Sequence, residues 1–123
     1  MYSSLQAFMR YIDMAHEIES QDPIAQLDAT ERFLLEVLVK YWIQGQPLTV
    51  TQTMALNRIG APATMHRKIT RLRQLSMIEA LGDEDDSRIK YLLPTRQATA
   101  YFTQMGEAMR SALSPQNGES TVA

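Results

Sequence analysis

Residues 49–75 read TVTQTMALNRIGAPATMHRKITRLRQL, and this stretch decides the fold. Thr49 and Gln52 have the spacing of a capping box, which predicts a short helix that runs to about Asn57. A glycine and a proline within residues 60–62 then predict a sharp turn, because glycine tolerates unusual backbone angles and proline suits the first position of a helix. Two short helices joined by a tight turn indicate a helix-turn-helix motif.

The second helix of this pair is predicted over residues 62–75. Met65, Ile69, Leu72 and Leu75 recur at the spacing of one helix face, so they predict the side that packs on the core. The same stretch holds four Lys or Arg residues and no acidic residue. We therefore expect a basic face that points away from the core.

A basic helix with small residues near its start fits the major groove of B-DNA, where arginine can donate two hydrogen bonds to guanine. We expect Thr64, Arg67 and Arg71 to read bases and Lys68 and Arg73 to contact phosphates. The rest of the predicted DNA-contacting set flanks this face, begins the preceding helix or lies on the following hairpin: Thr49, Thr51, Ala63, His66, Thr70, Arg88 and Lys90. The alternative is an ordinary solvated basic surface.

A β-hairpin is predicted after the basic helix. Residues 78–81 and 88–93 are short strand-like runs on either side of a polar turn. We expect Arg88 to reach the minor groove of DNA, oriented by a salt bridge to Asp86, the alternative being a plain exposed ion pair. The acidic run 83–86 would be repelled by phosphates, and it lacks the ligand spacing of a calcium loop, so we predict no metal there.

The central helix is predicted to begin at Asp28, which forms a second capping box with Glu31, and to stop at Gly45. Its residues are apolar almost all round, which predicts a helix buried on most sides at the centre of the fold. A small-molecule pocket near Tyr11, Tyr41 and Trp42 is an alternative to a plain aromatic core at these positions, and we favour the core.

Two terminal helices complete the predicted fold. Apolar residues cover more than half of the circumference of the helix over residues 5–20, and a second apolar seam runs along the helix that Thr95 can cap. We expect these surfaces to form a homodimer, the alternative being core helices of a monomer. The predicted dimerisation residues are Leu5, Phe8, Ile12, Tyr101, Phe102, Met105 and Met109.

The 123 residues are enough for one compact core, which predicts a single domain over residues 1–113 followed by a disordered tail over residues 114–123. Within that domain, we expect residues 1–21 and 96–113 to form the dimerisation helices. The absence of cysteine excludes disulfides and thiolate metal sites, and no secretory signal or long apolar run is present, so we expect a soluble, cytoplasmic protein.

Charge is distributed unevenly along the chain. Residues 1–57 hold three basic and seven acidic side chains, residues 58–96 hold eight and five, and residues 97–123 hold one and two, which sums to the net charge of −2. Most of the positive charge therefore coincides with the predicted helix-turn-helix and hairpin.

Several local motifs together resemble the MarR family of regulators. They are LDATE at residues 27–31, LTVTQ at 48–52, RLRQLSMI at 71–78, DSR at 86–88 and LPT at 93–95, and the resemblance covers about residues 27–113. It implies a mainly α fold with a small β-hairpin wing, a winged helix-turn-helix in a homodimer clasped by its terminal helices. It also implies binding to pseudo-palindromic operators in double-stranded DNA, often with release by a small ligand. The family's wing arginine corresponds to Arg88, and glycine is frequent at the positions of Ser76 and Ala98.

The sequence offers little support for an enzyme or a cofactor. His16 and His66 lie on different predicted elements, and no nucleophile elbow, P-loop or zinc-protease motif is present. A metal site of His16 with Glu17 and Glu19 is less favoured than a surface histidine. The stronger alternative is a winged-helix module that binds protein, an adaptor or antirepressor, because the isoelectric point and the hairpin tip are acidic. We expect a DNA-binding transcription regulator, with repression as the first interpretation.

Overall fold

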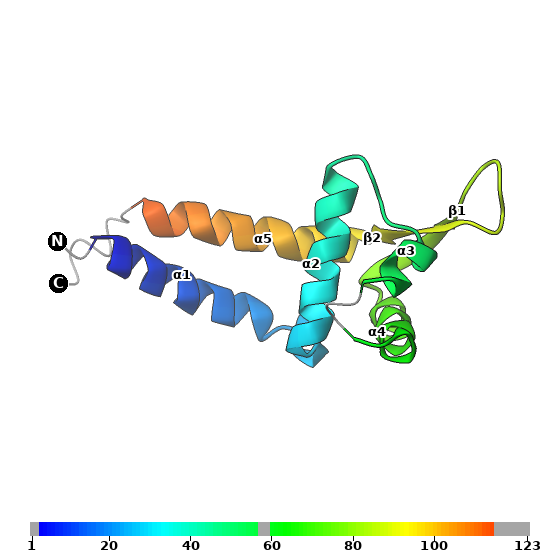
Figure 1. Ribbon diagram of the computed structural model, residues 1–123. Helices are drawn as coiled ribbons and strands as arrows, with labels where there is room; N and C mark the ends of the chain where they lie inside the picture. Colours follow the sequence, from blue (N-terminus) through cyan, green and yellow to red (C-terminus); the bar gives the residue numbers. More distant parts are fainter. Residues whose placement is uncertain (1–2, 57–59, 115–123) are drawn as a thin grey trace. The chain divides into compact units, whose positions relative to one another are not determined.

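The computed structural model describes residues 3–56 and 60–114 (Figure 1). In chain order the elements are α1 (Ser3–Glu19), the 3-10 helix η1 (Ile24–Gln26), α2 (Ala29–Ile43), α3 (Val50–Met54), α4 (Pro62–Gln74), β1 (Ile78–Gly82), β2 (Lys90–Pro94) and α5 (Arg96–Leu113). The described residues divide into two compact units, one within residues 27–99 and the other within residues 3–26 and 100–114. Of the helices described, none is both long and apolar enough to cross a membrane.

Both predicted capping boxes are confirmed. At the start of α2 the Glu31 backbone N–H donates to Asp28 Oδ1 (2.7 Å), and the Asp28 backbone N–H donates to Glu31 Oε1 (2.9 Å). At the start of α3 the same exchange joins Thr49 and Gln52, at 2.9 and 3.1 Å. Gly45, with φ of 80°, follows the last turn of α2 as predicted. The expected end of α3 at Asn57 lies outside the described residues.

The core of the 27–99 unit is made by one face each of α2, α4 and the hairpin. Its largest fully buried side chains are Leu34, Leu35, Leu38, Met65, Leu72, Met77 and Leu92. The opposite sides of α2 and α4 carry exposed side chains, among them Phe33 and Arg67.

The predicted hairpin is confirmed as an antiparallel pair, in which Ala80 lies opposite Leu92. The side of β2 that faces the core carries Leu92 and Pro94, whereas Tyr91 is only half-buried. The Leu92 backbone N–H also donates to the carbonyl oxygen of Leu48 (2.9 Å), which attaches the segment before α3 to the hairpin. This third backbone segment fixes the face that β2 turns inward.

The prediction that α2 is buried on most sides is wrong. Phe33, Tyr41 and Trp42 are 37–40% exposed and Ile43 is 74% exposed. The buried leucines of α2 lie on one side of the helix, and only that side packs on the hairpin and α4. The plain aromatic core that we favoured at Tyr41 and Trp42 is therefore not formed.

In the other unit, α1 and α5 lie side by side (Figure 1), joined by hydrogen bonds between the two helices. The Arg10 guanidinium donates from Nε and Nη2 to the carbonyl oxygen of Ala112, at 3.1 and 2.6 Å. A positive charge at the carbonyl end of α5 is favourable, because the helix dipole makes that end negative. Ala15, Ala108 and Ala112 are buried, and their small side chains let the helices approach closely.

The end of α4 holds a residue in an unfavourable backbone conformation. The Ser76 backbone N–H donates to Arg73 O (3.0 Å) and the Met77 backbone N–H donates to Leu72 O (2.9 Å), which is the Schellman pattern of a helix end. Ser76 has φ of 59°, the left-handed conformation that glycine adopts most easily. The Ser76 carbonyl also accepts from Thr95 Oγ1 (2.7 Å), and Thr95 caps α5 as predicted.

Replacing Ser76 with glycine should stabilise the protein, because glycine removes the cost of placing a Cβ in this conformation while the backbone hydrogen bonds remain. We expect Ser76→Gly to gain about 0.5–1 kcal/mol and to raise Tm by about 2–5 °C in thermal unfolding followed by circular dichroism. Ser76→Ala is the matched control, because it keeps the Cβ and should give no gain. Equal Tm values for the two variants would contradict this account.

Candidate nucleic-acid interface

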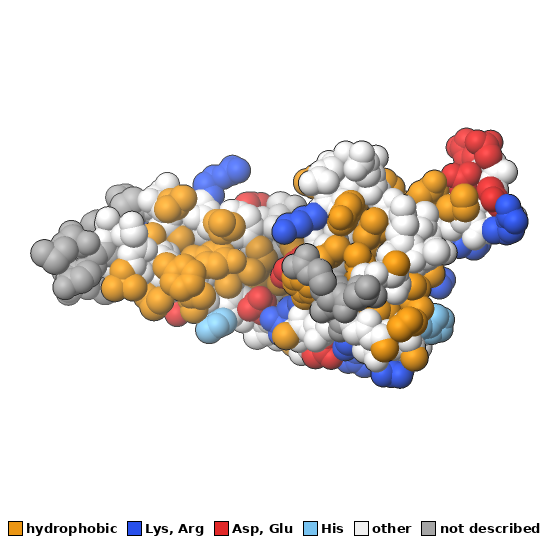
Figure 2. Space-filling view, in the orientation of Figure 1, with side chains coloured by type: hydrophobic (Ala, Val, Ile, Leu, Met, Phe, Trp, Pro, Cys, Tyr) orange, Lys and Arg blue, Asp and Glu red, His pale blue; other side chains and the backbone are white. Residues whose placement is uncertain are grey.

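The helix α4 is oriented by its apolar seam. Met65, Ile69 and Leu72 are buried as predicted, and Pro62 stands at the first turn. With that seam held in the core, the opposite side of the helix must point outward. Figure 2 shows basic side chains around α4.

The outward side of α4 carries Arg67 at its centre. Arg67 Nη2 donates to Thr64 Oγ1 (3.2 Å), so these two predicted base-reading side chains lie next to each other. Thr64 is half-buried, and the exposed members of the predicted set on this helix are Ala63, His66, Arg67, Thr70, Arg71 and Arg73. This arrangement leaves Arg67 exposed beside small side chains.

Lys68 and Arg71 are placed differently from what we expected. Lys68 Nζ lies 3.2 Å from Asp28 Oδ2, and the Lys68 side chain is only 17% exposed. Arg71 Nε lies 3.2 Å from Glu31 Oε2. Both side chains therefore form ion pairs with the start of α2, but only that of Lys68 is mostly buried, whereas the Arg71 side chain is 45% exposed.

The acidic partners on α2 already have a second role, since they form the capping box. Glu31 is buried, with one carboxylate oxygen held by the Asp28 backbone and the other by Arg71. The pKa of Asp28 lies below its ordinary value, first because its carboxylate accepts from the Glu31 backbone and further because of Lys68. These contacts favour the charged form of Asp28.

The remaining predicted DNA contacts lie at the start of α3 and on the hairpin. Thr51 is exposed, while the Thr49 hydroxyl is used as the helix cap. Lys90 is exposed at the first position of β2.

The predicted salt bridge at the hairpin is confirmed. Arg88 Nε donates to Asp86 Oδ1 (3.0 Å) and Arg88 Nη2 donates to Asp86 Oδ2 (2.9 Å), a bidentate pair. This pairing lowers the pKa of Asp86 and raises that of Arg88. The Arg88 side chain is 88% exposed, so it extends from the hairpin while its guanidinium is oriented.

Asp83 holds the turn of the hairpin together. Its Oδ2 accepts from the backbone N–H groups of Asp85 (2.9 Å) and Asp86 (3.1 Å), and its Oδ1 accepts from the Tyr91 hydroxyl (3.0 Å). The pKa of Asp83 is lowered, first by the Asp85 backbone bond and then by Tyr91. Acidic side chains gather at the outer end of the hairpin (Figure 2).

Several solved structures have a fold similar to that of this chain. The adhesin competence repressor AdcR from Streptococcus pyogenes is 22% identical, with 89% of this chain and 73% of that chain covered and a TM-score of 0.51. The transcriptional regulator Tm0710 from Thermotoga maritima is 16% identical, with 97% and 87% covered and a TM-score of 0.58. The heme sensor protein PefR from Streptococcus agalactiae, in complex with heme, is 14% identical, with 97% and 78% covered and a TM-score of 0.57.

The chain has a MarR-like winged helix-turn-helix fold. The fold class implied by the sequence resemblance is thereby confirmed. No protein-family model and no curated protein matches the sequence. In this fold α3 and α4 are the helix-turn-helix, and the hairpin over residues 78–94 is the wing.

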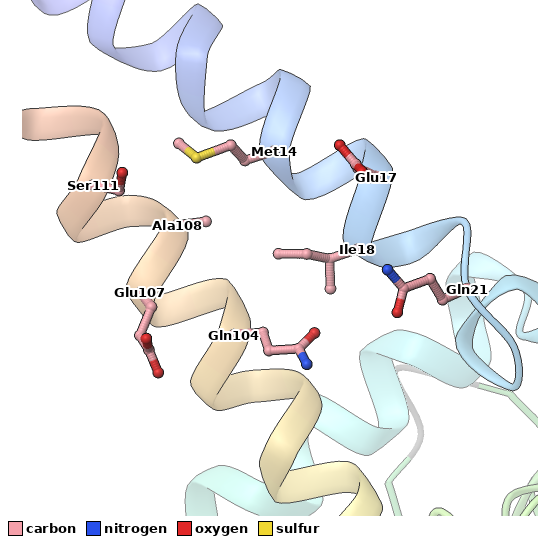
Figure 3. A pocket seen from close by; sticks show the side chains of 8 residues that line it. All are labelled: Met14, Glu17, Ile18, Gln21, Gln104, Glu107, Ala108 and Ser111. Atoms are coloured by element: carbon pink, nitrogen blue, oxygen red, sulfur yellow. The ribbon is translucent and has the colours of Figure 1, made fainter. Parts of the chain in front are cut away.

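Two cavities lie along the α1 and α5 pair. One, of about 450 Å³, has Met14 and Ile18 of α1 and Gln104 and Ala108 of α5 extending into the space between the helices (Figure 3). The other, of about 290 Å³, is apolar, and Tyr11 is among its lining residues. Tyr41 and Trp42, which we considered together with Tyr11, line neither of them.

The predicted dimerisation residues differ in exposure. Leu5, Phe8 and Met109 are 55–56% exposed and the last two line the apolar cavity. Ile12, Phe102 and Met105 are half-buried. Tyr101 is buried in its own chain, and its hydroxyl donates to Glu19 Oε2 (3.4 Å), so it is a core residue of the helix pair.

No group of three or more His, Cys, Asp or Glu side chains that could hold a metal ion occurs within residues 3–56 and 60–114. The sequence reading missed Asp28 and Glu31 as the ion-pair partners of α4. A signal was present, because Lys68 and Arg71 are three residues apart, so their side chains lie near each other on the helix.

The hydrogen bond from Tyr91 should be visible in the titration of Asp83. The lowered pKa means that this carboxylate stabilises the wing above its ordinary pKa of 3.8 and loses that effect as pH falls through the lowered value. In a pH titration of the carboxyl group by NMR, Tyr91→Phe should move the pKa of Asp83 upward, toward 3.8. Tyr41→Phe is the control and should leave it unchanged. The same pKa in wild type and Tyr91→Phe would contradict the hydrogen bond from Tyr91 to Asp83.

Proposed function

We propose that this protein binds double-stranded DNA as a transcription regulator, with α4 in the major groove and the wing at the adjacent minor groove. The observation that carries the proposal is the outward face of α4, where Arg67 stands beside Thr64 with its neighbours exposed. The similar structures named AdcR and Tm0710 are described as a repressor and a transcriptional regulator, which supports the same function here.

The contacts divide between bases and phosphates. Arg67 and Thr64 lie in the first half of α4, the part of a recognition helix that contacts base edges, and Ala63 leaves room for close approach. His66 and Arg73 flank this face and suit the phosphates on either side.

The wing supplies Arg88 to the minor groove, where negative potential attracts arginine. Asp86 orients the guanidinium without burying it, and Lys90 stands next to it at the start of β2. The exposed Glu84 and Asp85 are then best placed away from the phosphate backbone, at the outer end of the wing.

We further propose a homodimer formed by α1 and α5. Exposed apolar side chains gather on this helix pair, at Leu5, Phe8, Met9, Met109 and Leu113. A contiguous exposed apolar surface of this kind marks a protein interface, and a twofold dimer would present two recognition helices to a pseudo-palindromic site as a repressor.

A small-molecule effector is part of the proposal. The similar protein PefR is described as a heme sensor in complex with heme, and in this chain the cavity of about 450 Å³ between α1 and α5 offers space for a ligand. Binding there would change the stability of the helix pair and, through it, the dimer.

The second candidate is a winged-helix module that binds protein. Two observations favour it: Lys68 and Arg71 of α4 are engaged by α2, and the end of the wing is acidic. The two functions make opposite predictions for DNA binding, so the following experiment separates them.

Arg67→Ala should weaken binding to a specific duplex by about 1–3 kcal/mol, because a bidentate contact to guanine is lost. The probe is a duplex enriched from a random pool by the wild-type protein, measured by fluorescence anisotropy at several salt concentrations. Arg96→Ala removes the same charge at an exposed position outside the recognition helix and should bind like wild type. Failure to enrich a duplex, or equal affinity of Arg67→Ala and wild type, would favour the protein-binding module.

Phe8→Glu should convert the dimer to a monomer, because it places a charge in the apolar surface of α1. Sedimentation velocity at micromolar concentration measures the result. Leu81→Glu is the control, since Leu81 is 57% exposed on the wing, and we expect this variant to remain dimeric. A wild-type monomer, or a dimer of Phe8→Glu, would overturn the proposed interface.

A further inference from the structure

The four basic residues of the recognition helix fall into two groups with different surroundings. Arg67, Arg71 and Arg73 are exposed and Lys68 is mostly buried, but Lys68 and Arg71 form ion pairs with the start of α2. A shared positive charge therefore does not imply that all four residues have the same role.

The ion pairs form a matched set between the two helices. Lys68 pairs with Asp28 and Arg71 pairs with Glu31, both at 3.2 Å. The two bases are three residues apart on α4, and the two acids are three residues apart on α2. Two contacts at the same spacing hinder both rotation of α4 about its axis and sliding of α4 along α2.

The set is anchored by a buried charge. Glu31 is buried, and its two oxygens accept from the Asp28 backbone and from Arg71. Removing one partner of a buried ion pair is strongly destabilising, because the remaining charge stays desolvated. Arg71, whose side chain is 45% exposed, is therefore held at α2 through Nε, and turning Nε away to DNA would leave the buried Glu31 carboxylate without that partner.

Lys68 is constrained in a similar way. Its side chain is 17% exposed, so most of it packs along the protein, and its ammonium group reaches Asp28 Oδ2. Asp28 Oδ1 is meanwhile occupied by the Glu31 backbone N–H. The carboxylates at the start of α2 thus also hold α4 in place through these ion pairs.

We propose that Asp28 and Glu31 are positioning residues for DNA recognition: through Lys68 and Arg71 they set the orientation in which α4 presents Arg67. This inference rests on the proposed function, and it assigns Lys68 and Arg71 to α2 rather than to DNA. The consequence is that a loss of negative charge at Asp28 or Glu31 weakens specific binding, although less repulsion of DNA would on its own strengthen it.

The test uses the full-length protein, the duplex enriched from a random pool and a scrambled duplex of the same length. Glu31→Gln keeps an acceptor for the capping box and removes the charge that Arg71 faces. Glu36→Gln is the matched control, because it removes the same charge at an exposed position of the same helix. Asp28→Asn keeps the helix cap and is the second variant, which decides the outcome if Glu31→Gln does not fold by circular dichroism.

We expect Glu31→Gln and Asp28→Asn to bind the enriched duplex about tenfold more weakly than Glu36→Gln, with affinity for the scrambled duplex unchanged. If Asp28 and Glu31 only stabilised the fold, the ratio of the affinities for the enriched and the scrambled duplex would be the same in all folded variants. The salt dependence supplies a second readout: Arg67→Gln should reduce the slope of log K against log salt concentration by about one, whereas Lys68→Gln should not.

Binding of the enriched duplex by Asp28→Asn as tight as that of Glu36→Gln, or tighter, would overturn the positioning role. A reduced salt slope for Lys68→Gln, equal to that for Arg67→Gln, would do so as well. In either case the proposed function stands if Arg67→Ala weakens binding. Absence of salt-dependent duplex binding by the wild type would overturn both proposals.

Discussion

The buried carboxylate of Glu31 is the constraint on which the DNA-binding unit depends. A carboxylate removed from water must be paired or hydrogen-bonded at both oxygens, and here the partners come from two different elements. One partner is the Asp28 backbone N–H, so Glu31 helps to cap the start of α2. The other partner is Arg71, so Glu31 also contacts α4. A single charge therefore couples the beginning of one helix to the orientation of another.

This coupling explains how one short helix serves three purposes. Met65, Ile69 and Leu72 give α4 its apolar contact with the core and turn its opposite side outward, but apolar contact is non-directional. The charged flank beside that seam adds directional contacts to α2. Only the remaining side, with Arg67 near its centre, is left for a partner. The basic surface is consequently smaller than the count of Lys and Arg in the helix indicates.

Acidic residues of the wing also have partners within the protein. The Asp83 carboxylate accepts from two backbone N–H groups and from the Tyr91 hydroxyl, and the Asp86 carboxylate accepts from Arg88. Two of the four acids in the run over residues 83–86 therefore shape the turn and orient the arginine. The acidic sequence, which argues against a nucleic-acid contact when read as net charge, becomes compatible with one when half of its charge has an internal partner.

What the sequence determined by itself was local. Both capping boxes, the apolar seam of α4, the hairpin and the pairing of Asp86 with Arg88 depend on residues a few positions apart, so spacing alone was enough to predict them. The tertiary structure alone decided which face of β2 is buried, that the end of α2 is exposed, and that Lys68 lies against Asp28, forty positions away. Those outcomes depend on which surfaces of separate elements meet. The periodicity of a helix or strand shows which of its sides is polar or apolar, but not which distant partner covers that side.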